Sequence, residues 1–93
     1  MKKIKVPELK DTAKLMASED YKERFKAEYW QLKIRYEKLK AFCNRIEAAG
    51  MKDEEAPAHD CSLELLRAQQ SVMGQYLHWL ELRAEIENVA LEW

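Results

Sequence analysis

The sequence has 93 residues, of which 47% are hydrophobic and 35% are charged, so its composition is that of one globular domain, residues 1–93, and not of a disordered segment. A net charge of −1 argues against binding to duplex nucleic acid, and the lack of about 18 consecutive apolar residues or of a secretory leader predicts a cytoplasmic protein without a membrane span. Two glycines and two prolines are too few for a fold rich in turns, so the sequence predicts an all-α protein.

The first predicted helix is short and spans residues 7–16. Pro7 suits the first helical position, because it has no amide hydrogen to lose there. Leu9, Ala13 and Met16 then recur on one face, as in an amphipathic helix.

The next two predicted helices are long and span residues 19–49 and 62–90. Ser18 can cap the first of them, and Gly50 is a natural left-handed terminator for it. Asp60 or Ser62 can cap the second, which leaves the polar, proline-containing residues 51–61 as the connection.

Apolar residues on the long helices form more than one stripe. Spacings of three and four residues predict one seam on each helix, and these two seams pack into an antiparallel hairpin. The seam of residues 19–49 comprises Phe25, Tyr29, Leu32, Tyr36, Leu39, Cys43 and Ile46, and that of the last predicted helix comprises Leu66, Gln70, Met73, Leu77, Leu80, Ala84 and Leu91. A second seam with heptad spacing comprises Leu65, Ala68, Val72, Trp79, Leu82, Ile86, Val89 and Trp93, and residues 19–49 carry Trp30, Ile34 and Phe42 off their seam. These residues need a second partner, so we expect a homo-oligomer with an interface that includes Trp30, Ile34, Val72, Trp79, Ile86 and Trp93.

Charge is divided between the two halves of the chain. Residues 1–52 hold 14 Lys and Arg against 8 Asp and Glu, whereas residues 53–93 hold 2 against 9. One interpretation is that a basic helix and an acidic helix attract each other while most charges remain solvated. The other is that part of the basic excess binds a small anionic nucleotide through phosphates, with an aromatic ring stacked on the base. The residues that suit this second interpretation are Lys22, Arg24, Lys26, Lys33, Arg35, Tyr21, Tyr29 and Trp30.

Signatures of catalysis and of metal binding are missing from the sequence. Both glycines stand alone, so there is no glycine-rich phosphate loop, and there is no nucleophile elbow or paired-histidine zinc motif. The stretch "HDC" at residues 59–61, even with Cys43, has no usual zinc spacing. We therefore expect no enzymatic activity, no metal and no cofactor, and we expect Cys43 and Cys61 to be reduced.

The stretches "DYKERFKAEYWQLKIRYEKL" and "CSLELLRAQQSVMGQYLHWLELRAEIE" resemble a group of small helical-hairpin proteins of phages and prophages, including relatives of a crAss-like phage protein. Their layout is similar to the hairpin of the phage anti-CBASS sponge proteins, a fold shared by part of one class of anti-Thoeris sponges. The similarity covers residues 18–88 and includes the pattern "SLxL…VM", which is present here as Ser62, Leu63, Leu65, Val72 and Met73. The "FxYHPP" motif of the sponges is missing, and this chain has "VPELKDTAKLMASEDY" in its place.

Several expectations follow from this resemblance alone. Sponges of this type assemble as multimers, typically hexamers, and sequester cyclic nucleotide immune signals between protomers without cleaving them. The resemblance assigns phosphate binding to Lys22, Arg24 and Lys26 and base stacking to Tyr21. Arg83 corresponds to an arginine near the end of the third helix of the sponges. It implies a phage-encoded anti-defence protein in the cytoplasm of the infected bacterium. The alternative is a small helical interaction protein that inhibits or scaffolds a host or phage protein.

Overall fold

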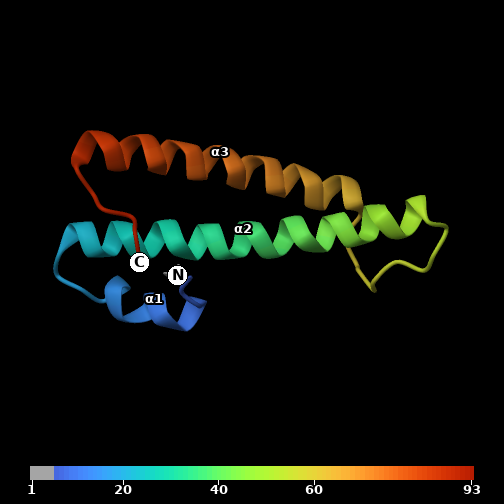
Figure 1. The fold of residues 1–93 in the computed structure, drawn as a ribbon, viewed down its shortest axis with the longest axis horizontal. Helices are drawn as coiled ribbons and strands as arrows, with labels where there is room; N and C mark the ends of the chain where they lie inside the picture. Colours follow the sequence, from blue (N-terminus) through green and yellow to red (C-terminus); the bar gives the residue numbers. More distant parts are fainter. Residues whose placement is uncertain (1–5) are drawn as a thin grey trace, which may run out of the picture.

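The structure is a computed structural model that describes residues 6–93, and in these residues it contains three helices and no strand. Helix α1 spans Leu9–Met16, α2 spans Tyr21–Met51 and α3 spans Leu63–Glu87. The helices α2 and α3 form a long antiparallel hairpin, and α1 packs on the opposite side of α2 from α3 (Figure 1). The all-α prediction is therefore confirmed, with one short helix followed by a hairpin.

The caps of α2 differ from those that the sequence predicted. Its N-cap is Asp20, whose carboxylate accepts a hydrogen bond from the Lys22 amide at 2.9 Å, while Ser18 lies two residues earlier and its hydroxyl donates to Glu23. Gly50 does not end the helix, because the left-handed residue is Asp53, with φ of 58°. The amide of Glu54 then returns to the Ala49 carbonyl at 2.8 Å, as in a Schellman ending.

The ends of α3 are set by two polar residues. Ser62 is the N-cap, as the sequence predicted, and its hydroxyl accepts a hydrogen bond from the Leu65 amide at 3.1 Å. At the other end Asn88 adopts a left-handed conformation with φ of 59°, so the helix stops at Glu87, three residues before the predicted end. Residues 88–93, which we call the strap, then fold back toward α2 (Figure 1).

Helix α1 begins two residues later than the sequence predicted. The amide of Glu8 donates to the Asp11 carboxylate at 2.9 Å, which fixes the first turn and leaves Pro7 outside the helix. Thr12 is fully buried, and its hydroxyl accepts a hydrogen bond from the Gln31 amide group at 3.0 Å. This contact attaches α1 to the first half of α2.

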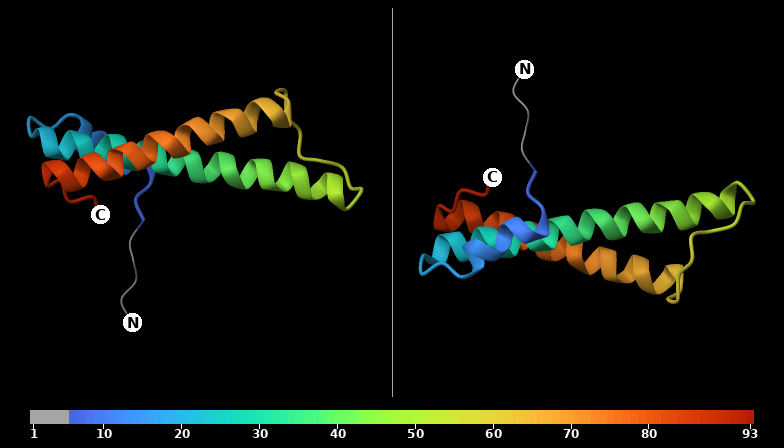
Figure 2. Two further views of the ribbon diagram at one scale, coloured as in Figure 1. Left: turned by 90° about the horizontal axis from the view of Figure 1, so that it is seen from above. Right: turned by 90° about the horizontal axis from the view of Figure 1, so that it is seen from below.

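The core is small and lies mainly at the end of the hairpin where α2, α3 and the strap meet. Phe25, Tyr29, Leu77, Leu80, Ala84 and Val89 form its buried cluster. The radius of gyration is 16.1 Å, whereas a compact domain of this length would have about 12 Å. The two long helices cross and then diverge toward the loop (Figure 2), and several of their large apolar side chains remain exposed among residues 6–93. None of the helices described is both long and apolar enough to cross a membrane.

Candidate functional site

The residues that the sequence suggested for ligand binding gather around the first half of α2, at the end of the hairpin where the core lies. At this end the Tyr21 hydroxyl contacts the Glu87 carboxylate and accepts a hydrogen bond from Arg83 at 2.9 Å. Arg83 also donates to Glu87 at 2.8 Å and lies 4.9 Å from the centre of the Phe25 ring. The structure thus brings Tyr21 and Arg83 together, as members of a network that joins α2 to α3.

The charges in this network shift the pKa values of its members. The hydrogen bond from Arg83, followed by that from Tyr21, lowers the pKa of the Glu87 carboxyl. The same carboxylate raises the pKa of the Tyr21 hydroxyl through its hydrogen bond. Tyr21 therefore stays a neutral donor and the Arg83 guanidinium has an anionic partner within the chain.

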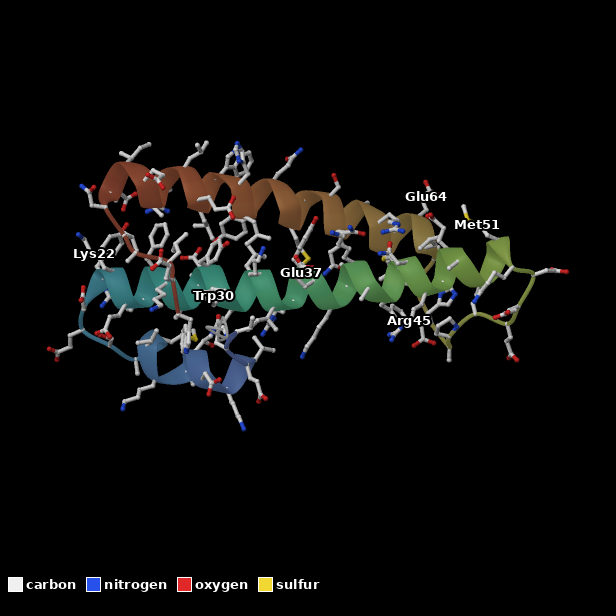
Figure 3. The ribbon with its side chains drawn as sticks, viewed as in Figure 1. Lys22, Trp30, Glu37, Arg45, Met51 and Glu64 are labelled. Atoms are coloured by element: carbon white, nitrogen blue, oxygen red, sulfur yellow. The ribbon has the colours of Figure 1, made fainter. Side chains whose placement is uncertain are left out.

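Lys22 and Lys26 lie one turn apart on α2 and both contact the strap. The Lys22 ammonium donates to the Asn88 carbonyl at 3.1 Å, and that of Lys26 lies 5.1 Å from the centre of the Trp93 ring. Figure 3 shows Lys22 at the end of α2 that lies beside the C-terminal end of α3. A hollow of about 280 Å³ opens here, and it is lined by Leu15, Lys22, Glu23, Lys26, Asn88, Val89 and Ala90. We call it the lysine hollow.

Tyr29 is a buried residue and not an exposed stacking platform. Its hydroxyl donates to the Glu81 carboxylate at 2.9 Å, and only 7% of the residue is exposed. Burial, with a smaller contribution from Glu81, raises the pKa of Tyr29 to about 12. Its ring belongs to the hairpin core, as the seam predicted.

The three other predicted cations of α2, Arg24, Lys33 and Arg35, do not line the lysine hollow. Arg24 donates to the Ser18 carbonyl at 2.8 Å and so ties the turn before α2 to the helix. Lys33 lies two turns beyond Lys26 and pairs with Glu37 at 3.8 Å. It lines a second, larger cavity.

This larger cavity is a groove of about 740 Å³ between α2 and the start of α1. Most of its lining surface is apolar, and three lysines and two glutamates also line it; we call these five charged residues its rim. The lining residues are Val6, Pro7, Glu8, Leu9, Lys10, Trp30, Lys33, Ile34, Glu37 and Lys38. Figure 3 shows Trp30 at the edge of α2 that faces α1. We call this cavity the α1 groove.

Trp30 connects the α1 groove to the strap. Its indole nitrogen donates to the Leu91 carbonyl at 2.6 Å, and its ring lies 6.5 Å from that of Trp93 at an angle of 79°. Two of the predicted interface residues, Trp30 and Trp93, therefore pack against each other within one chain. Ile34, a third, lies half-buried in the groove.

The other predicted interface residues remain exposed on α3. Val72, Trp79 and Ile86 recur every seven residues and are 65%, 58% and 78% exposed. Leu65 and Leu82 extend the same face, at 57% and 49% exposed. We call these five residues the α3 stripe. The predicted seam ran on to Val89, but the turn at Asn88 takes Val89 into the core.

The α1 groove was not predicted as a site. Leu9 was assigned to an apolar face and Pro7 to a helix start, and Lys10 and Lys38 were given no role. The sequence did contain an indication of this groove. Trp30 and Ile34 lie off the hairpin seam of α2, and the short amphipathic helix that precedes α2 could pack beside them.

The cysteines and the "HDC" stretch lie away from these cavities. Cys43 is buried in the hairpin and Cys61 is exposed in the loop, and both are free thiols. A ring nitrogen of His59 lies 2.6 Å from the Cys61 carbonyl, within the loop that leads to α3. This contact shapes the approach to the Ser62 cap.

Comparison with protein families gives a match over both long helices. The family model described as Sequestin matches residues 19–86. The chain belongs to the Sequestin family. The name is consistent with a protein that sequesters another molecule, as the resemblance to sponge proteins implied. Comparison with curated proteins and with solved structures gave no match.

The part that matches Sequestin contains the hairpin with its cations and the α3 stripe. It excludes α1, which forms one wall of the α1 groove, and it ends before the strap. The lysine hollow and the α1 groove therefore each combine the α2 helix of the Sequestin hairpin with a segment outside the matched range.

Proposed function

We propose that this Sequestin is a phage-encoded anti-defence protein that sequesters a small anionic nucleotide, of the cyclic-nucleotide class used as immune signals, in the cytoplasm of the infected bacterium. It binds the signal and releases it unchanged, without catalysis. Phosphates pair with the cations near the start of α2, and an aromatic ring packs against the base.

The observation that carries this proposal is the lysine hollow. Lys22 and Lys26 line it from successive turns of α2, and their partners within the chain are a carbonyl oxygen and an aromatic ring, not carboxylates. A phosphate can replace such partners with stronger, charge-assisted hydrogen bonds. Glu23 is the single carboxylate in the lining, so the cations outnumber it.

Self-association is part of the proposal. Within one chain the α3 stripe has no partner among residues 6–93, and five large apolar side chains at helical spacing favour burial against another helix. A pair of copies related by twofold symmetry buries both stripes at once. Higher assemblies of such pairs would provide a sponge with several nucleotide sites.

The test of sequestration is calorimetric titration of the protein with a panel of cyclic dinucleotides, cyclic trinucleotides and cyclic ADP-ribose. We expect saturable binding of one class and full recovery of the intact ligand after denaturation. Lys26→Ala should weaken binding at least tenfold, because a charge-assisted phosphate contact is lost. The matched control is Lys14→Ala, an exposed lysine of α1 that lines neither cavity.

Two results would overturn the proposal. One is the lack of heat and of thermal stabilisation with every member of the panel, since a ligand that binds the native state raises the melting temperature. The other is recovery of a cleaved ligand, which would establish an enzyme.

The α3 stripe favours a second candidate function, that of an interaction protein which inhibits or scaffolds a host or phage protein. In this case the stripe binds the partner protein, and the nucleotide panel has no effect. Trp79→Asp would then abolish capture of the partner and Lys26→Ala would not. If the protein is a sponge, Lys26→Ala reduces nucleotide binding more than Trp79→Asp does.

A further inference from the structure

We propose that the α1 groove binds the nucleobase of the ligand and that the lysines on its rim bind a phosphate of the same ligand. This inference rests on the proposed function, and it assigns the ligand a site within a single chain. The occupant is a nucleotide with phosphodiester or pyrophosphate groups.

The size and lining of the groove suit a planar, largely apolar group. Its volume of about 740 Å³ lies within the range of small-molecule sites, which are mostly apolar with a few polar groups placed at the edge. The groove has one aromatic side chain, Trp30, and is otherwise walled by Val6, Pro7, Leu9 and Ile34. A nucleobase can bury both faces between such walls, because stacking on an aromatic ring tolerates any base.

Trp30 is held in a fixed position while no ring is stacked on it. Its indole N–H is already engaged by the Leu91 carbonyl, so the ring cannot swing away without breaking that bond. The neighbouring rings of Tyr29 and Trp93 lie nearly perpendicular to it, at 87° and 79°. A parallel stacking partner is therefore missing among residues 6–93, and a nucleobase would supply one.

The charges at the rim complement a phosphate. Lys10 comes from α1, and Lys33 and Lys38 come from α2, so cations approach the groove from both walls. Lys10 pairs with Glu8 at 3.5 Å and Lys33 with Glu37 at 3.8 Å, and all four side chains are at least 37% exposed. Such exposed pairs contribute little and exchange readily. Lys38 has no ion pair in the described part of the chain, which leaves the rim with one more cation than it has carboxylates.

The groove also connects to the lysine hollow through the same helix. Lys26 and Lys33 are seven residues apart on α2, which is about 10 Å at the rise of an α-helix. A nucleotide with two phosphate groups can thus place its base beside Trp30 and reach cations at both positions.

The test uses two pairs of matched substitutions on α2 in the full chain, titrated with cyclic di-AMP and cyclic ADP-ribose. Ile34→Asp places a carboxylate inside the groove, while Ala41→Asp adds the same charge at an exposed position of the same helix outside it. Lys38→Glu reverses a rim charge, while Lys40→Glu reverses an exposed charge that does not line the groove. We expect both groove variants to lose at least tenfold in affinity and both controls to stay within twofold of wild type.

The outcomes separate this inference from the proposed function. If wild type binds a probe and all four variants bind it equally well, the α1 groove is not the base site, although sequestration stands. If wild type binds no member of the full nucleotide panel, the proposed function itself fails, and this inference with it. Circular dichroism monitors folding, and if Ile34→Asp does not fold, the comparison of Lys38→Glu with Lys40→Glu decides.

Discussion

The α3 stripe allows a quantitative prediction for the substitution Ile86→Asp. Ile86 is 78% exposed in the single chain, so the substitution should change the stability of the monomer by less than about 0.5 kcal/mol. In a twofold pair the same side chain would be buried in both copies. Full burial of an isoleucine contributes about 1.5–3 kcal/mol, so the exposed fraction corresponds to about 2 kcal/mol in each copy and about 4 kcal/mol in the pair. The dissociation constant should therefore rise by about a thousandfold.

Sedimentation equilibrium over a range of concentrations measures this change directly. The mass of one chain is 11.0 kDa, so a pair and a monomer are easily distinguished. Ala41→Asp is the matched control, because it adds the same charge at an exposed position of α2. A wild-type protein that remains a monomer at high concentration would refute self-association. A loss smaller than tenfold with Ile86→Asp would show that the stripe is not the interface.

Three further predictions concern the stability of the chain. Leu80 is 1% exposed, so Leu80→Ala should lower the free energy of unfolding by about 3 kcal/mol in urea titrations, and an unchanged midpoint would show that the core lies elsewhere. Asn88 has φ of 59°, so Asn88→Ala should cost about 1 kcal/mol by the same measurement, whereas Asn88→Gly should be tolerated; equal effects would show that the turn is not left-handed. The pKa of Tyr29 is raised to about 12 from 10.0, so the folded chain holds this proton more tightly than the unfolded chain. The contribution of protonated Tyr29 to the free energy of unfolding should be fully present below pH 10 and fall by about 1.4 kcal/mol per pH unit as the pH rises toward 12. Tyr29→Phe should remove this part of the pH dependence of alkaline unfolding.

The hairpin could be predicted from the sequence because each seam repeats for several turns. Phe25, Tyr29, Cys43 and Ile46 are buried on α2, and Leu77, Leu80 and Ala84 are buried on α3, as the three- and four-residue spacing indicated. A repeat over several turns follows directly from helix geometry, so it predicts the helix even where single residues do not fit the pattern.

The helix ends were harder to predict, because they depend on one residue each. Gly50 was expected to take the left-handed conformation, yet the chain places it at Asp53 and continues the helix through Gly50. Asn88 ends α3 in the same way, which the heptad pattern through Val89 and Trp93 concealed. Asparagine and aspartate tolerate this conformation, but nothing in their immediate sequence requires it.

The candidate site was predicted only in part, since its contacts join segments far apart in sequence. Cations and rings near the start of α2 could be recognised from composition, but the partners of Lys22, Lys26 and Trp30 come from the strap. The α1 groove depends on how α1 is attached to α2, where Gln31 contacts both Thr12 and Met16, and no periodicity reveals these contacts.

The different environments of the two cysteines provide a practical route to labelling this protein. Cys43 has no exposed surface, whereas Cys61 is exposed in the loop that joins α2 and α3. A maleimide dye should therefore attach at Cys61 alone while the protein is folded. Both ends of the described chain lie near the opposite end of the hairpin from this loop (Figure 1), so a dye there would leave the strap and both cavities untouched. Fluorescence anisotropy or surface immobilisation through this thiol could then follow binding and assembly without any substitution in the chain.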